Sequence, residues 1–303
     1  MVARSLAGGG QGCAACGHGM APKDDQLGVA GASMSPGLAK MAARAAAAAP
    51  FAKAADLLAD LAGIELTAKR FERSAEAGGT AAGAAIDAET DAILSRRVVP
   101  LPPAPLPDML YIAIDGTGVP MIPAETDGRP GKATDGRART REVKLACLFT
   151  QTSLDHDHRP VRDPASSTYL ATLAPAEPFG ELVAAEARRR GSEHIRQLVV
   201  LAAAAARALP PGRPEGPRTR QGWPTSRPTP TGCATPTSAA SACSSAPARS
   251  RPAARPVIGQ RLKLSGMRWS VPGAASIALL RCQQASGRWE QIWQRPHNQT
   301  TVA

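Results

Sequence analysis

The stretch that decides the fold is Asp-Met-Leu-Tyr-Ile-Ala-Ile-Asp-Gly-Thr-Gly, residues 108–118. Its apolar part, 110–114, is β-rich, short for a helix, and bounded by Pro107 and Gly116, which predicts a buried central strand. Asp115 is then expected at the carboxyl end of that strand, where a rigid element would hold a carboxylate that still reaches solvent. A hard divalent cation such as Mg²⁺ requires this geometry. The alternative is an ordinary turn, because Asp-Gly is a common turn dipeptide.

The residues after Asp115 predict more strands of the same sheet. A polar hairpin tip at 125–141 leads into a second strand at 143–150. A weaker third strand is expected within 159–172, where threonine, tyrosine and leucine raise the strand propensity.

A helix and a fourth strand complete this pattern. Residues 179–190 place apolar side chains on one helical face, with acids early and three arginines at the end, and Gly191 ends the helix. Residues 197–201 are apolar enough for a fully buried strand. The order β-β-β-α-β, with an aspartate after the first strand, is that of a ribonuclease H-like nuclease core in an α/β fold.

Three strings in this region carry a family resemblance. They are Ile-Asp-Gly-Thr-Gly-Val-Pro-Met at 114–121, Glu-Thr-Asp-Gly-Arg-Pro-Gly-Lys at 125–132 and Asp-Gly-Arg-Ala-Arg-Thr-Arg-Glu-Val-Lys-Leu at 135–145. With Val-Ile-Gly-Gln-Arg-Leu-Lys and Arg-Pro-His-Asn-Gln-Thr-Thr near the end, the chain closely resembles the Kra-type family of bacterial insertion-sequence transposases, over roughly residues 12–201 and 257–303. The resemblance implies an enzyme in which three acids (Asp, Asp, Glu) hold two Mg²⁺ or Mn²⁺ ions for attack on a phosphodiester. Asp115 matches the first acid.

The second and third acids of the family pattern are absent from their expected places. In the family, the fourth strand is followed at once by Gly-Asp-Gly-Ala, whereas here 202–206 are alanines and the next acid is Glu215. The third acid belongs to a Glu-Ser-Ala-Cys block just before Val-Ile-Gly-Gln, but 250–256 contain no acid. We therefore expect the first half of a catalytic domain at 108–201 and an inactive, degenerate copy of the enzyme.

The composition of 202–256 indicates how the acids were lost. This tract has eight arginines, no lysine and one acid, and so supplies +7 of the net charge of +11. It lacks Ile, Val, Phe and Tyr, so we expect a disordered basic tract. A plausible coding of Glu-Ser-Ala-Cys-Arg, read one nucleotide late, gives Ser-Arg-Pro-Ala-Ala, the residues at 250–254. We infer a frameshift near 202 with a return to frame near 256; the alternative is a basic arm that binds DNA.

The first 34 residues resemble the remnant of a zinc knuckle. Cys13 and Cys16 form a C-x-x-C turn, but the cysteine pair that precedes it in the family is missing. Two thiolates do not complete a structural Zn²⁺ site, which takes four ligands, and His18 would supply only a third. The sequence therefore predicts at most an incomplete Zn²⁺ site at Cys13 and Cys16.

Residues 35–99 predict an all-helical region. Ser35-Pro36 opens a helix, and 51–62 forms a second whose inner face includes Leu61. Thr67 caps a third, basic helix, while 75–85 is rich in alanine and glycine and weakly specified. The arrangement fits a helix-turn-helix DNA reader, and it fits a plain three-helix bundle with a solvated basic face equally well; the family resemblance favours DNA binding. Prolines at 100–107 then predict a stiff linker.

The candidate DNA-contacting residues are cations in three places: the third helix, the hairpin tip and the C-terminal segment. They are Lys69, Arg70, Arg73, Arg137, Arg139, Arg141, Arg261, Lys263 and Arg268. The C-terminal segment, 257–303, is expected to be helical and, without the missing middle, poorly placed on the core.

These observations predict a transposase of a bacterial insertion sequence that has become inactive. The alternative is a non-catalytic DNA-binding fragment derived from one. The expected partner is double-stranded DNA at the element ends, with oligomers formed through DNA synapsis. No apolar run reaches membrane-spanning length and 1–20 lack the apolar core of a signal peptide, so we expect a cytoplasmic, nucleoid-associated protein.

Overall fold

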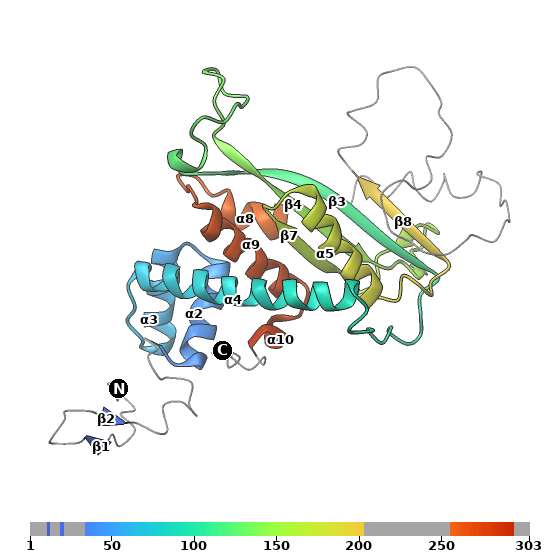
Figure 1. Cartoon of the computed structure of the whole chain (residues 1–303), viewed down its shortest axis with the longest axis horizontal. Helices are drawn as coiled ribbons and strands as arrows, with labels where there is room; N and C mark the ends of the chain where they lie inside the picture. Colours follow the sequence, from blue (N-terminus) through green and yellow to red (C-terminus); the bar gives the residue numbers. More distant parts are fainter. Residues whose placement is uncertain (1–10, 13–18, 21–33, 203–254, 294–303) are drawn as a thin grey trace.

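The central element is a mixed four-stranded sheet. The structure, a computed structural model, describes residues 11–12, 19–20, 34–202 and 255–293. The four strands are β3 (Met109–Pro120), β4 (Thr140–Phe149), β7 (Thr168–Thr172) and β8 (Gln197–Ala202), in the order β7-β4-β3-β8. Strand β8 is parallel to β3, and the other neighbours are antiparallel. The fold is an α/β arrangement in which helices cover the sheet (Figure 1).

Alternation along β3 divides the core in two. Leu110 and Ile112 face α5 (Ala176–Arg189), which connects β7 to β8. Tyr111 and Ala113 face the opposite side, where the C-terminal helices lie. Both faces of the central strand are therefore buried, as the apolar run at 110–114 predicts.

The prediction for the end of this strand is wrong. Asp115 lies inside β3, which continues through Gly116, Thr117 and Gly118 to Pro120. These residues pair with Leu145 through Thr140 of β4, so backbone pairing overrides the turn propensity of Asp-Gly-Thr-Gly.

Within the described residues, three helices precede the sheet: α2 (Pro36–Ala48), α3 (Phe51–Ala62) and α4 (Ala68–Leu94). The hydroxyl of Ser35 caps α2, Gly63 ends α3 in the left-handed conformation, and Thr67 caps α4. Leu61 is 84% exposed, which corrects its expected place on the inner face.

The alanine- and glycine-rich part of α4 is continuous helix, contrary to the expectation of a weakly specified segment. Gly79 explains why. A side chain there would place its Cβ 2.4 Å from the Cβ of Ser276 on α9 (Val271–Ala285), so the glycine permits close contact between two helices. Burial against α9 then stabilises a stretch whose propensity for helix is low.

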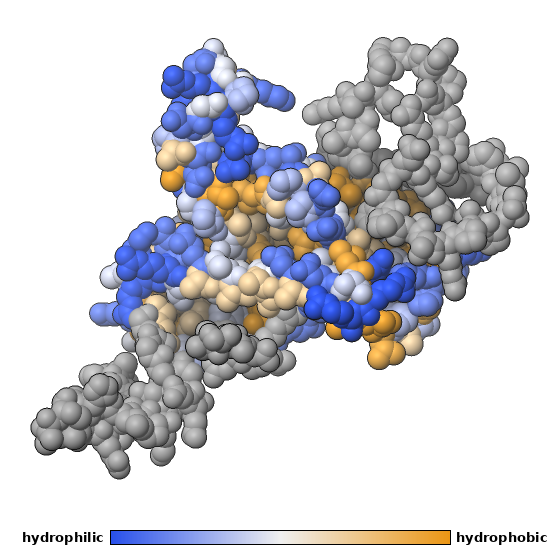
Figure 2. Space-filling view, in the orientation of Figure 1, coloured by the Kyte–Doolittle hydropathy of each residue, from blue (hydrophilic) through white to orange (hydrophobic). Residues whose placement is uncertain are grey.

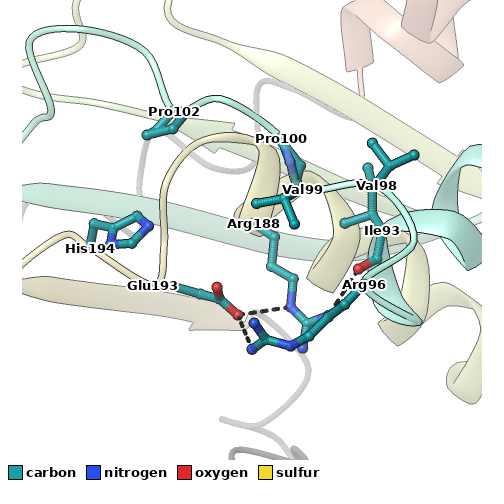
Figure 3. A pocket seen from close by; sticks show the side chains of 9 residues that line it. All are labelled: Ile93, Arg96, Val98, Val99, Pro100, Pro102, Arg188, Glu193 and His194. Atoms are coloured by element: carbon teal, nitrogen blue, oxygen red, sulfur yellow. Dashed lines mark hydrogen bonds and ion pairs between the residues drawn. The ribbon is translucent and has the colours of Figure 1, made fainter.

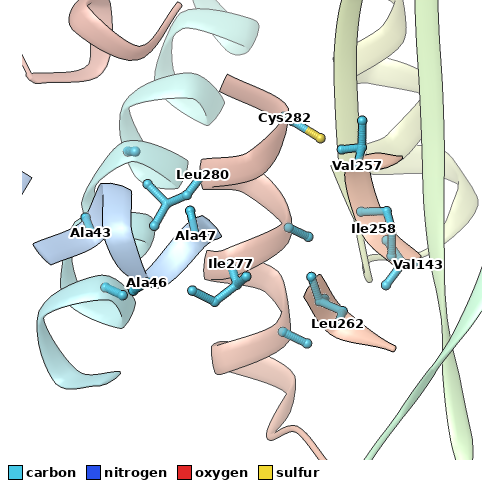
Figure 4. Packing of buried hydrophobic residues seen from close by; sticks show 14 of the residues in the cluster. Ala43, Ala46, Ala47, Val143, Val257, Ile258, Leu262, Ile277, Leu280 and Cys282 are labelled. Carbon is cyan, nitrogen blue, oxygen red and sulfur yellow. The ribbon is translucent and has the colours of Figure 1, made fainter. Parts of the chain in front are cut away.

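The C-terminal segment is firmly packed, which corrects the expectation that it would be poorly placed. Its first turns, η3 (Arg255–Gly259) and α8 (Gln260–Leu262), are followed by α9 and α10 (Trp289–Trp293). Figure 4 shows α9 between α2 and the sheet, with Ile277 and Leu280 towards the alanines of α2 and Val257 and Ile258 beside Val143. Residues separated by more than 200 positions thus share one core.

The prolines at 100–107 lie against the connection between α5 and β8. A Cβ on Gly191 would meet Leu106 at 2.6 Å and Pro102 at 2.9 Å. Beside this contact, Arg96 and Arg188 both pair with Glu193 around a cavity of about 30 Å³ (Figure 3).

The smaller elements of the described part of the chain are two short hairpins and one turn of 3₁₀ helix. They are β1 (Gln11–Gly12) with β2 (Gly19–Met20), β5 (Ser153–Leu154) with β6 (Pro160–Val161), and η1 (Pro123–Glu125). None of the helices within the described ranges combines the length and apolar character that crossing a bilayer requires.

Candidate nucleic-acid interface and the surroundings of Asp115

Asp115 is half-buried on the central strand, next to the end of its parallel neighbour. The last pair between β3 and β8 joins Ile114 to Ala202, so Asp115 lies one residue beyond it. Its Oδ1 accepts a hydrogen bond of 2.8 Å from the amide of Gly116. A ligand contributed just after β8 would therefore lie beside this carboxylate, but the residues after Ala202 are outside the described part.

The acid nearest to Asp115 on β4 faces away from it. Glu142 is opposite Gly118, and its carboxylate lies over Gly116, where an added Cβ would meet Oε1 at 2.2 Å. Gly116 and Asp115 are consecutive in a strand and point to opposite faces of the sheet. Glu142 and Asp115 consequently cannot hold one metal ion together.

The acids in the loop after β4 form hydrogen bonds within that loop. Asp163 accepts hydrogen bonds from Thr150 Oγ1 at 2.5 Å and from the amide of Thr152 at 2.8 Å. Desolvation raises the pKa of Asp163, but these hydrogen bonds outweigh it and the net shift is downward. Thr150 follows the pair Phe149–Tyr111, so this loop begins four residues, roughly 13 Å, along β3 from Asp115.

The described side chains do not fit the metal site that the family resemblance implies. Within 34–202 and 255–293, no three His, Cys, Asp or Glu side chains come together as a metal-binding group. Asp115 is therefore a single carboxylate here, whereas two Mg²⁺ ions require several. Cys13 and Cys16 lie outside the described residues.

The hairpin between β3 and β4 projects beyond the sheet (Figure 1) and has an ordered tip. Gly128 and Gly136 adopt positive φ angles of 66° and 72°, which suit glycine. At Gly131 an added Cβ would lie 2.3 Å from Cα of Ala138, so only glycine allows the two sides of the tip to approach. These three glycines fix the backbone conformation of the tip and so the positions from which its side chains extend.

The cations of the hairpin fall into two groups. Arg139 pairs with Asp135 at 2.6 Å, and Arg141 pairs with Glu125 at 3.6 Å. Arg137 is exposed and makes no ion pair with a described residue. Arg129 and Lys132 are exposed in the same way; the sequence reasoning did not single them out, although they share the tip with Arg137.

Lys263 and Arg268 lie at the base of this hairpin. The ammonium of Lys263 donates to Thr117 Oγ1, which is on the same face of β3 as Asp115, roughly 7 Å along the strand. Trp269 forms a bridge with Met121, which brings the exposed Arg268 beside the hairpin. The structure thus gathers cations from two sequence regions, the hairpin and the C-terminal segment, at this end of β3.

Contacts between the hairpin base and α4 extend this surface. Glu125 accepts a hydrogen bond from the amide of Val271 at the start of α9. Two residues later, an added Cβ on Gly273 would meet Oε1 of Glu76, on the third turn of α4, at 2.7 Å. Figure 2 shows hydrophilic residues over the hairpin and over the α3–α4 end.

The predicted cations of α4 lie in its first two turns and are all exposed. Lys69 pairs with Glu72 at 2.7 Å, and Arg73 has no ion pair among the described residues. Arg70 donates its backbone amide to the cap residue Thr67. Residues 51–78 contain four Lys or Arg and five Asp or Glu, so this end has no excess of positive charge.

Arg261 is not a surface cation, and its predicted DNA contact is wrong. Its side chain is completely buried between Phe51 and Trp269, each ring centre 4.9 Å from the guanidinium. Its Nε donates to the carbonyl of Ala46 at 2.8 Å, and Arg281 donates to the carbonyl of Ala47 at 2.7 Å. Burial, and then Arg281, lower the pKa of Arg261 to about 10. Both arginines therefore satisfy the last carbonyls of α2, where the helix dipole favours cations.

No family model, curated protein or solved structure matches this chain.

Proposed function

We propose that this chain derives from a Kra-type insertion-sequence transposase and that it binds duplex DNA without cutting it. The observation that carries the proposal is the place of Asp115 on the central strand, one residue beyond the end of the parallel strand β8. The element order β3, β4, β7, α5, β8 is the β-β-β-α-β order of a ribonuclease H-like core. In such a core the second acid follows the fourth strand, beside the first.

The exposed cations favour DNA as the partner. The side chains of Arg129, Lys132 and Arg137 extend from the hairpin and form no ion pair with a described acid, so phosphate oxygens would be suitable ligands for them. In a recognition helix, residues near the N-terminal end contact the base edges. The cations of α4 lie at the corresponding end of that helix. The hairpin would then contact the DNA phosphate backbone while the first turns of α4 lie in a groove of the duplex.

Catalysis is not expected, because a single carboxylate does not fix two magnesium ions. Magnesium keeps most of its waters and binds a lone exposed carboxylate weakly. The purified full-length chain should show no Mg²⁺- or Mn²⁺-dependent cleavage or strand transfer on linear and supercoiled DNA that carries the ends of the element. Robust cleavage that disappears in Asp115→Asn would contradict this prediction and would mean that acids outside the family pattern complete the site.

The origin of the tract after β8 can be tested at the level of the gene. If a frameshift removed the second and third acids, another reading frame should encode Gly-Asp-Gly after codon 201 or Glu-Ser-Ala-Cys near codon 250. Reading codons 202–256 in all three frames checks this directly. If neither block occurs in any frame, the frameshift explanation is wrong. The basic tract would then be an original part of the protein, such as the DNA-binding arm given above as the alternative.

A further inference from the structure

The outer edge of the sheet at β8 is open within the part of the chain that the structure describes. Strand β8 has β3 as its single neighbour and ends the order β7-β4-β3-β8, as Figure 1 shows. On the α5 side of the sheet, its Leu198 and Val200 side chains are 45% and 53% exposed. Apolar side chains at alternate positions of an edge strand are the pattern by which another strand is recruited.

The backbone of β8 is also oriented for pairing at this edge. The amide of Gln197 donates to the carbonyl of Asp108 at 3.1 Å, so residues 197, 199 and 201 direct their backbone groups towards β3. Leu198 and Val200 consequently direct their N–H and C=O groups outward. The exposed side chains and the outward backbone groups belong to the same two residues.

The chain that continues from β8 is poorly suited to cover this edge. Residues 203–254 contain ten prolines and no Val, Ile, Phe or Tyr. Proline cannot donate to a β ladder, and the missing residues are the main strand formers. A matching strand is therefore better supplied by another molecule, and the apolar six-residue segment of β8 is itself such a strand.

We propose that two copies of this chain associate through β8, as an antiparallel pair about a twofold axis at Val199. Leu198 of each copy is then opposite Val200 of the other, and these two residues exchange both of their backbone hydrogen bonds. Their side chains lie next to each other on the same face, where each pair buries apolar surface. The two four-stranded sheets become one continuous sheet.

Charge and symmetry favour this arrangement over the parallel one. Arg196, which is exposed, directly precedes β8. In the antiparallel pair each Arg196 lies opposite Ala202 of the other copy, so the two cations are at opposite ends. A parallel pair would place them side by side, and it could not close as a twofold dimer with identical surfaces.

Analytical ultracentrifugation of the full-length chain without DNA tests the proposal. The wild type should show a reversible monomer–dimer equilibrium over a wide range of protein concentration. The double variant Leu198→Lys/Val200→Lys places charges at the edge and should stay monomeric. The matched control, Leu101→Lys/Leu154→Lys, changes two leucines that are 93% and 60% exposed elsewhere and should dimerise like the wild type. A wild type that is monomeric throughout, or an edge variant that dimerises like the wild type, would overturn the proposal.

Cross-linking tests the register. In Val199→Cys the two new thiols face each other across the axis, with Cβ atoms about 5 Å apart, and mild oxidation should give a covalent dimer above the wild-type background. In Gln197→Cys each thiol lies opposite Leu201 of the other copy and should give no such dimer. Equal cross-linking of both variants, or none of either, would contradict pairing about Val199. The absence of DNA separates this association from DNA-mediated assembly, so its outcome is independent of the proposed function.

Discussion

Replacing Glu186 with alanine should lower the free energy of unfolding by about 3–5 kcal/mol. The Glu186 side chain is 3% exposed and receives both terminal nitrogens of Arg288, at 2.6 and 2.7 Å. Burial lowers the pKa of Arg288, but hydrogen bonds with Glu186 outweigh it and the net shift is upward. Removing the carboxylate leaves a largely buried guanidinium without its partner. Urea unfolding followed by circular dichroism measures the loss.

Two further variants show that the loss comes from an uncompensated charge. Glu186→Leu/Arg288→Met replaces the pair with apolar side chains of similar size and should recover most of the stability. Asp157→Ala removes a carboxylate that is 48% exposed and pairs with Arg159 at 3.5 Å, and should cost at most about 1 kcal/mol. A stability of Glu186→Ala within about 1 kcal/mol of the wild type would mean that the pair is not buried as described.

The position of Glu186 also explains what this network holds together. Glu186 is on α5, Arg288 follows α9, and Arg189 links Glu186 to Glu89 on α4 at 3.3 and 2.6 Å. Three elements from distant parts of the sequence therefore meet at one carboxylate. The spacing of the sequence places Glu186 among the acids of an amphipathic helix but contains no signal of its partner 102 residues away.

Local sequence signals predict the elements that local physics determines. The apolar run at 110–114, the amphipathic helix near 179–190 and the caps at Ser35 and Thr67 all appear where they were expected. Each depends on neighbours within a few residues. The conformation of Asp-Gly-Thr-Gly at 115–118 does not depend on sequence neighbours. It is extended because these residues pair with β4.

The sequence predicted which cations belong to the candidate site, but it did not predict which of them are buried. Arg129, Arg137 and Arg139 at the hairpin tip are exposed because a long polar segment between two strands has no core to enter. Arg261 belongs to a similar basic stretch, but Phe51 and the carbonyl of Ala46, more than 200 residues earlier, enclose it. Only the tertiary structure brings these groups together, so a pattern of cations along the sequence cannot separate Arg261 from Lys263.

Removal of the unpaired hairpin cations should weaken duplex binding strongly. In Arg129→Ala/Lys132→Ala/Arg137→Ala three exposed side chains without a described acid partner are lost. If each contacts one phosphate, the slope of log K against log salt should become less steep by about 2.7, because each contact releases about 0.9 counterion. The same release implies an affinity loss of about 500-fold at 0.1 M salt. Fluorescence anisotropy with a labelled duplex of the element end measures both quantities.

The full-length chain is the right material for this experiment, because α2 and α4 share their core with the C-terminal helix α9. A matched control is Arg97→Ala/Arg159→Ala/Arg196→Ala, which removes three exposed arginines away from the hairpin. Arg196 precedes β8 beside the beginning of β3, the opposite end of that strand from the hairpin. This control should leave the salt slope nearly unchanged. The variant Lys69→Ala/Arg70→Ala/Arg73→Ala examines the α4 part of the interface in the same assay.

The salt dependence of duplex binding by the wild type and the hairpin variant tests the central claim most directly. The claim predicts that wild-type affinity falls steeply as salt rises and that the hairpin variant falls less steeply by about three phosphate contacts. Equal slopes for the wild type and the hairpin variant would contradict a DNA interface at the hairpin. A wild type with no measurable affinity at low salt would contradict DNA binding by this chain altogether.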